Sequence, residues 1–186
     1  TQKGRVGIAS VCLEEDSARI VSDKEKDIVY RLDRLGIPLI EIATEPEIKT
    51  PEQAKEVALH IGEILRSCKV KRGLGTIRQD VNLSIRHGKR IELKGFQDIS
   101  NIERAVISEI KRQEKLVGLG KSISEVRRVL PNGESEFLRP MPGAARMYPE
   151  TDLPLLRISR SMIDEAKKNI PKLKKDIEEE LEEEGL

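Results

Sequence analysis

Apolar and polar residues alternate along several segments of this chain, as they do in β-strands. Residues 5–14 and 28–32 are apolar enough to predict two strands. A third strand is predicted within LDRLGIPLIEIATEPE, residues 32–47, where Gly36 and Pro38 bracket its start. The N-terminal part of the chain is therefore expected to form sheet.

Two segments carry the apolar stripe of an amphipathic helix. Thr50 offers an N-cap and Pro51 suits the first position of a helix predicted over 51–67. Ser100 and Glu103 predict a capping box for a second helix. The stripe of that second helix consists of Ile102, Val106, Ile110 and Leu116.

The segment between these helices predicts a hairpin. Residues 76–86 alternate in polarity, and the turn HGKR leads to a partner strand at 91–96. Residues 118–157 contain several Gly and Pro and predict a linker with one weak strand around SEFLR, and Pro171 splits the charged C-terminal stretch into two helices. Together these elements indicate an α+β domain with a largely antiparallel sheet and flanking helices, followed by a short helical segment.

Composition narrows the class of protein. Lys and Arg total 34 and Asp and Glu 33, so the net charge does not indicate a nucleic-acid or membrane-surface binder. The two cysteines form no disulfide framework, which favours a reducing, cytoplasmic setting. No apolar run approaches the roughly 18 residues of a membrane span and no signal peptide opens the chain, so a soluble protein without a membrane partner is expected.

A glutamate interrupts the apolar strand at position 41. An ionised carboxylate inside such a strand costs several kcal/mol, roughly, unless it meets a cation, a metal or hydrogen bonds. Because side chains alternate along a strand, Glu41 shares a face with Leu39 and Ala43. Ile40 and Ile42 lie on the opposite face.

The same alternation places a carboxylate on one face of four predicted strands. If their apolar faces pack on the helices, these carboxylates converge and repel one another unless a hard divalent cation such as Mg²⁺ binds them. We therefore predict a Mg²⁺-nucleotide site, although the pattern is equally typical of a sheet with one solvated face. The acidic residues are Glu14, Glu41, Asp80 and Glu92, with Asn82 beside Asp80 and with Arg78, Lys94 or the basic loop from Lys69 as candidates for binding phosphate.

Five motifs, in one order, resemble the GatB/GatE family, which contains the archaeal E subunit and the bacterial B subunit of Glu-tRNA(Gln) amidotransferase. The bacterial members have an EED motif, a PLIEI strand, an R-x-D-x-N strand and a YFPEPDLP motif in the same order. The resemblance runs from about residue 4 to 157. The motifs are EEDSAR (14–19), YRLDRLGIPLIEIATEPEI (30–48), VKRGLGTIRQDVNLSI (70–85), IELKGFQ (91–97) and GAARMYPETDLP (143–154).

The resemblance implies a fold and a reaction. Residues 1–157 are expected to form a cradle domain resembling glutamine synthetase, and residues 158–186 the start of a helical region. In the family, ATP phosphorylates the γ-carboxylate of glutamate on tRNA(Gln) with Mg²⁺ as cofactor. Ammonia from an asparaginase-like glutaminase partner then displaces phosphate and yields Gln-tRNA(Gln) in the cytoplasm.

The resemblance also implies roles for individual residues. Glu14 and Glu41 match the stable Mg²⁺ ligands, and Arg78 matches a phosphate or transition-state partner. Asp80, Asn82 and Glu92 match residues at a second, transient metal or the nucleotide.

Parts of the family's pattern have no match in this chain. They are an N-terminal segment with a histidine ligand, an inserted domain shared with bacterial aspartyl-tRNA synthetases, and a tail that grips tRNA. We therefore expect a fragment of the cradle domain that is inactive alone. Two rival interpretations are a non-catalytic module that docks tRNA or a partner protein, and a carboxylate-activating ligase outside translation.

Overall fold

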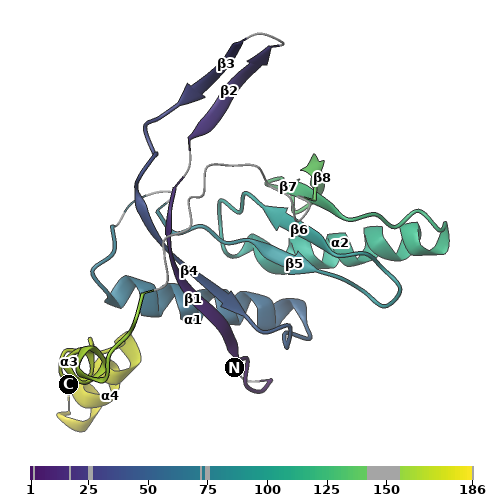
Figure 1. Cartoon of the computed structure of the whole chain (residues 1–186). Helices are drawn as coiled ribbons and strands as arrows, with labels where there is room; N and C mark the ends of the chain where they lie inside the picture. The colour runs from purple at the N-terminus through teal and green to yellow at the C-terminus, as the bar shows by residue number, and fades with distance from the viewer. Residues whose placement is uncertain are drawn as a thin grey trace. The chain divides into compact units, whose positions relative to one another are not determined.

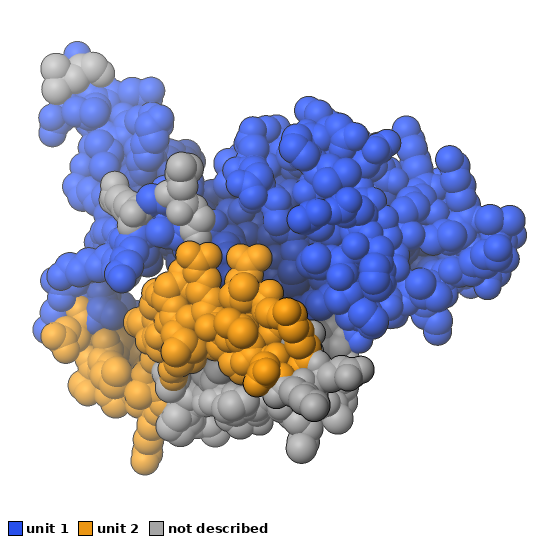
Figure 2. All heavy atoms as spheres, turned by 90° about the horizontal axis from the view of Figure 1, so that it is seen from above, with its two compact units in different colours: residues 1–4, 48–143, 166–186 blue, residues 5–47, 144–165 orange. Residues whose placement is uncertain are grey.

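The computed structural model divides into two compact units, which Figure 2 shows in different colours. Helices and antiparallel strands occur together, which confirms the predicted α+β class. The structure describes residues 1, 3–16, 18–24, 27–71, 73, 76–141 and 156–185. Unit 1 comprises Thr1–Gly4, Ile48–Gly143 and Ala166–Leu186, and unit 2 comprises Arg5–Glu47 and Ala144–Glu165.

Unit 2 is built from two antiparallel ribbons (Figure 1). Strand β1 (Ile8–Glu15) pairs with β4 (Pro38–Thr44), so the first and third predicted strands are both present. Strand β2 (Arg19–Lys24) pairs with β3 (Asp27–Arg31). The sequence did not predict β2, because its mixture of charged and apolar residues gives no clear alternation.

A hydrogen-bonded clasp joins the end of β1 to the turn before β4. Arg34 donates to the Asp16 carboxylate at 2.6 Å, and the Asp16 amide donates to the Ile37 carbonyl at 2.8 Å. Gly36, which adopts a φ of 79°, donates its amide to the Asp16 carbonyl at 3.1 Å. The clasp holds the two ends of the β1–β4 ribbon in one register.

Helix α1 (Pro51–Ser67) has the bounds that the sequence predicts. Thr50 has extended backbone geometry, and its hydroxyl accepts a hydrogen bond from the Gln53 amide. Pro51 occupies the first turn, where no amide donor is needed. These signals act within one turn of the chain, so they need no tertiary contact to place the start of the helix.

Replacing Thr50 with alanine should lower the free energy of unfolding by about 0.5–2 kcal/mol, because the Gln53 amide loses its cap. Urea unfolding followed by circular dichroism measures the change. The Thr50→Ser variant keeps the hydroxyl and should remain within a few tenths of a kcal/mol, roughly, of the parent. Equal losses in both variants would contradict the capping role.

Unit 1 holds a sheet of four strands in the order β5, β6, β7, β8, with helix α2 (Asn101–Gly118) on one side (Figure 1). The strands are β5 (Val81–Leu83), β6 (Ile91–Lys94), β7 (Glu125–Val129) and β8 (Ser135–Pro140). β5 and β6 form the predicted hairpin, whereas β6 and β7 run parallel and are connected through α2. The core cluster consists of Ile91, Leu93, Ala105 and Val129.

Three local predictions in unit 1 were wrong. Residues 125–140 form β7 and β8 rather than a linker with one weak strand. The strand predicted over 76–86 is confined to β5. Ser100 adopts helical geometry and its hydroxyl donates to Asp98 at 2.6 Å, so the predicted capping box with Glu103 does not form.

Two helices follow near the C-terminus, α3 (Arg160–Lys168) and α4 (Lys174–Glu183). Pro171 lies between them, as the sequence predicts. A helix long and apolar enough to cross a membrane was sought among the described residues and not found. The motif GAARMYPETDLP lies outside the described residues.

Candidate functional site

Two carboxylates lie on one face of the β1–β4 ribbon in unit 2. Glu41 pairs directly with Cys12, and Glu14, two residues further along β1, pairs with Leu39. Residues two apart on a strand share a face, so Glu14 and Glu41 are diagonal neighbours, a relation that spans roughly 7–8 Å. Glu14 is half-buried and Glu41 is exposed. Two oxygen donors therefore stand within reach of one cation.

A second polar group lies on one face of the β5–β6 hairpin in unit 1. Asn82 pairs with Glu92 across the hairpin, and Val81 pairs with Leu93. Continuing that register places Asp80 opposite Lys94. Leu93 is buried in the core, so the polar side chains lie on the other face of the sheet. Arg78 precedes this group by two residues and is exposed.

Lys94 lies between two carboxylates. Its Nζ is 2.6 Å from Asp80 Oδ2 and 3.0 Å from Glu92 Oε1. Partial burial alone would lower the pKa of Lys94, but the hydrogen bonds to Asp80 and Glu92 outweigh burial and raise the pKa above its usual value. Lys94 is therefore positively charged at neutral pH.

The raised pKa of Lys94 gives its ion pairs a defined pH range. Their contribution to stability should be complete below the unfolded lysine value of about 10.4 and should be lost as pH rises through the higher folded value. Urea unfolding of the native chain and of Lys94→Met, at several pH values from neutral upward, measures this. The difference between the two should stay constant below pH 10, roughly, and shrink above it. A difference that stays constant through the whole alkaline range would contradict the assignment.

The two acidic groups belong to different units, so their convergence on a single cation stays a prediction. Glu14 and Glu41 lie in unit 2, whereas Asp80, Asn82 and Glu92 lie in unit 1. Among the residues that the structure describes, no group of three or more His, Cys, Asp or Glu side chains is arranged to hold a metal ion. The chemistry of the Glu14 and Glu41 donors, two carboxylates on one face, nevertheless fits Mg²⁺.

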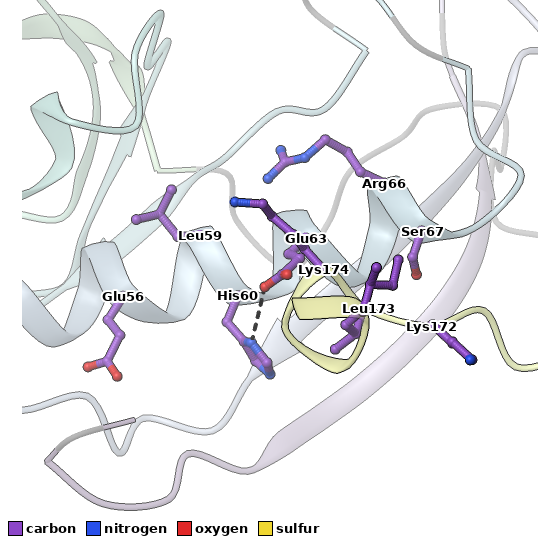
Figure 3. Close-up of a pocket in the computed structure, with 10 residues that line it drawn as sticks. Glu56, Leu59, His60, Glu63, Arg66, Ser67, Lys172, Leu173 and Lys174 are labelled. Carbon is purple, nitrogen blue, oxygen red and sulfur yellow. Dashed lines mark ion pairs between the residues drawn. The ribbon is translucent and has the colours of Figure 1, made fainter. Parts of the chain in front are cut away.

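A pocket of about 690 Å³ lies elsewhere in unit 1, between α1 and the segment around Leu173 (Figure 3). His60 lines it and forms an ion-pair contact of 3.9 Å with Glu63, as the dashed line in Figure 3 marks. None of the lining residues belongs to the predicted site. The pocket therefore does not identify the location of the chemistry.

Comparison with known proteins decides the family. The family model described as the GatB/GatE catalytic domain matches residues 1–164. The chain belongs to the GatB/GatE catalytic domain family. Proteins named as the E subunit of Glutamyl-tRNA(Gln) amidotransferase are similar to this chain in three archaea. The one from Methanocaldococcus jannaschii is 58% identical over 126 residues, which is 67% of this chain and 20% of the relative.

Two further relatives of the same name extend the comparison. The protein from Thermococcus gammatolerans is 53% identical over 137 residues, which is 73% of this chain and 22% of the relative. The protein from Pyrococcus horikoshii is 31% identical over 310 residues, covering 93% of this chain and 49% of the relative. This GatB/GatE domain thus spans between about a fifth and a half of the length of these relatives.

Sequence reasoning missed one polar cluster of this GatB/GatE domain, which lies between α2 and the sheet. Arg112 forms hydrogen bonds to Glu109 at 2.8–3.0 Å and an ion pair with Glu125 at 2.9 Å. Arg127 donates to Glu125 at 2.7 Å and to the Ser135 hydroxyl at 2.7 Å. The Glu109 side chain is fully buried. Two acidic and two basic side chains thus neutralise one another beneath the helix.

Proposed function

We propose that this chain is the part of a Glu-tRNA(Gln) amidotransferase that activates the glutamate carboxylate with ATP. The observation that carries the proposal is the register of the β1–β4 ribbon, which aligns Glu14 and Glu41 on one face within the segment matched by the family model. The relatives' names describe one component of an amidotransferase, which supports a ligase role in protein biosynthesis.

The proposed substrate is glutamate esterified to tRNA(Gln), and the proposed reaction has two steps. The γ-carboxylate accepts the γ-phosphoryl group of ATP, and ADP leaves. Ammonia then attacks the resulting acyl phosphate, inorganic phosphate leaves, and the side chain becomes the amide of glutamine. An asparaginase-like glutaminase partner supplies the ammonia, and the process takes place in the cytoplasm.

Glu14 and Glu41 would hold Mg²⁺. When bound, Mg²⁺ would offset charge on the phosphoryl group that is transferred. The two glutamates lie on neighbouring strands, so the ribbon itself fixes their spacing. The Asp16–Arg34 clasp at the end of the ribbon would keep that spacing constant.

The β5–β6 face would position the nucleotide. Lys94 is charged and partly exposed, so its ammonium is available to phosphate oxygens. Arg78 would contribute a second cationic group from the segment before β5. Asn82 and Glu92, which pair across the hairpin, would contact the nucleotide or a second cation.

A chimera tests the proposal. The matched segment of the M. jannaschii relative is replaced by this chain, and formation of Gln-tRNA(Gln) is measured with the glutaminase partner, ATP and Mg²⁺. The chimera should be active, and its Glu41→Gln variant should lose activity while staying folded by circular dichroism. A Glu41→Gln chimera as active as its parent would indicate a docking module without chemistry. Phosphorylation of free glutamate without tRNA would indicate a ligase outside translation.

A further inference from the structure

Lys94 and its two acidic partners form a closed charge arrangement on the sheet face. The Nζ to oxygen distances are 2.6 Å to Asp80 and 3.0 Å to Glu92. The Lys94 side chain is 30% exposed and that of Glu92 is 18% exposed, so the arrangement is only partly screened by water. On the adjacent strand β7, Arg128, the neighbour of Lys94, donates to Glu136 at 2.7 Å.

The position of the ammonium has a consequence for cation binding. Asp80 and Glu92, together with the Asn82 amide opposite Glu92, offer the oxygen ligands that hard divalent cations prefer. The Lys94 ammonium already occupies the place between the two carboxylates. A divalent cation that binds the same oxygens must therefore displace the ammonium, which would then need a new negative partner.

A phosphate group is such a partner. A lysine ammonium is a flexible point charge that binds phosphate oxygens well, and its stem of four carbons allows the head to turn without movement of the strand. Transfer of Lys94 from the carboxylates to a phosphate would free Asp80 and Glu92 for the cation. The three charges of the face would then all be compensated.

We propose that Lys94 is an internal counter-ion that keeps divalent cations off Asp80 and Glu92 until a nucleotide phosphate binds its ammonium. Cation binding at this pair is thereby coupled to nucleotide binding. Because such coupling is reciprocal, the cation strengthens nucleotide binding by the same factor, typically about 5–150-fold. The identity of the anion rests on the proposed function, whereas the exclusion of cations by Lys94 does not.

Binding of Mn²⁺, observed by electron paramagnetic resonance on the 186-residue chain, tests the exclusion. Mn²⁺ suits the same oxygen ligands as Mg²⁺. The experiment is carried out in a Glu41→Gln background, which silences the β1–β4 face. Lys94→Met should gain affinity for Mn²⁺ by at least about fivefold without nucleotide, the lower end of typical coupling. Adding Asp80→Asn should remove the gain.

Two matched variants complete the design. Lys94→Arg keeps the charge between the carboxylates and should show no gain. Lys111→Met removes an exposed lysine of α2 and should also leave Mn²⁺ affinity unchanged. Failure of Lys94→Met to gain affinity, or a gain that Asp80→Asn leaves intact, would overturn the exclusion.

A second arm adds a non-hydrolysable ATP analogue to the protein with native Lys94. Mn²⁺ affinity should rise with the analogue present, and in Lys94→Met the analogue should add little. An analogue that binds native protein without raising Mn²⁺ affinity would overturn the coupling. An analogue that does not bind at all would count against the proposed nucleotide function, and the Mn²⁺ results without nucleotide would then decide the exclusion alone.

Discussion

Replacing Glu109 with alanine is expected to lower the free energy of unfolding by about 3–5 kcal/mol, the typical result of breaking a buried ion pair from one side. Glu109 accepts hydrogen bonds from Arg112 and from the Ser135 hydroxyl, and its carboxylate lies 3.6 Å from Arg127. The variant leaves both guanidinium groups with Glu125 alone. Domains are stable by only about 5–15 kcal/mol, so this loss is a large fraction of the total.

Urea unfolding followed by circular dichroism measures the loss. Glu114 is an exposed glutamate of the same helix, so Glu114→Ala removes a carboxylate from α2 without touching the cluster. That control should change stability by less than about 0.5 kcal/mol. Similar losses in the two variants would mean that the cluster contributes no more than a solvated surface charge.

The second large effect concerns Glu14 and its neighbour Glu15. Glu14→Gln should weaken binding of Mg²⁺-ATP by more than about 100-fold, because loss even of an outer partner of a metal ligand typically costs 10–100-fold. Glu15 pairs with Pro38 and lies on the opposite face of β1. Glu15→Gln removes the same charge from the adjacent position and should change the affinity by less than about threefold, which is within the usual scatter of surface changes.

Isothermal calorimetry of Mg²⁺-ATP binding to the native chain and both variants makes this comparison. The two substitutions have the same chemistry and the same strand, so only the face differs. Equal weakening by Glu14→Gln and Glu15→Gln would indicate a general effect of charge rather than a ligand role. No weakening by either would remove the β1–β4 face from the nucleotide site.

Local signals explain what the sequence predicted well. The bounds of α1 follow from a cap, a proline and an apolar stripe, all within the helix or its first neighbour. The shared face of Glu14 and Glu41 follows from the two-residue period of strands together with the antiparallel register. Neither requires knowledge of the rest of the fold.

Non-local contacts explain what the sequence missed. Strand β7 carries Glu125 and Arg127 on its buried face, and such charges are typical of a solvated segment. Their burial is possible because Arg112 and Glu109, on a helix that begins 24 residues earlier in the chain, complete the charge cluster. The parallel pairing of β6 with β7 depends on the same helix, so antiparallel neighbours alone were expected.

The candidate site was predictable in part. Alternation places Asp80, Glu92 and Lys94 on one face, and the structure agrees. The position of the Lys94 ammonium between both carboxylates depends on the exact register of the β5–β6 hairpin, which alternation alone does not fix. The sequence therefore identified the participants but not their pairing.

The central claim is that the acidic faces of β1–β4 and β5–β6 serve one cation and one nucleotide. Nuclear magnetic resonance of the 21.0 kDa chain, labelled with ¹⁵N and saturated with one equivalent of Mn²⁺ and a non-hydrolysable ATP analogue, tests it directly. Paramagnetic broadening, relative to the Mg²⁺ complex, should affect the amides of Cys12 and Glu41 together with those of Asn82 and Glu92. Broadening confined to one of the two ribbons would contradict a shared site.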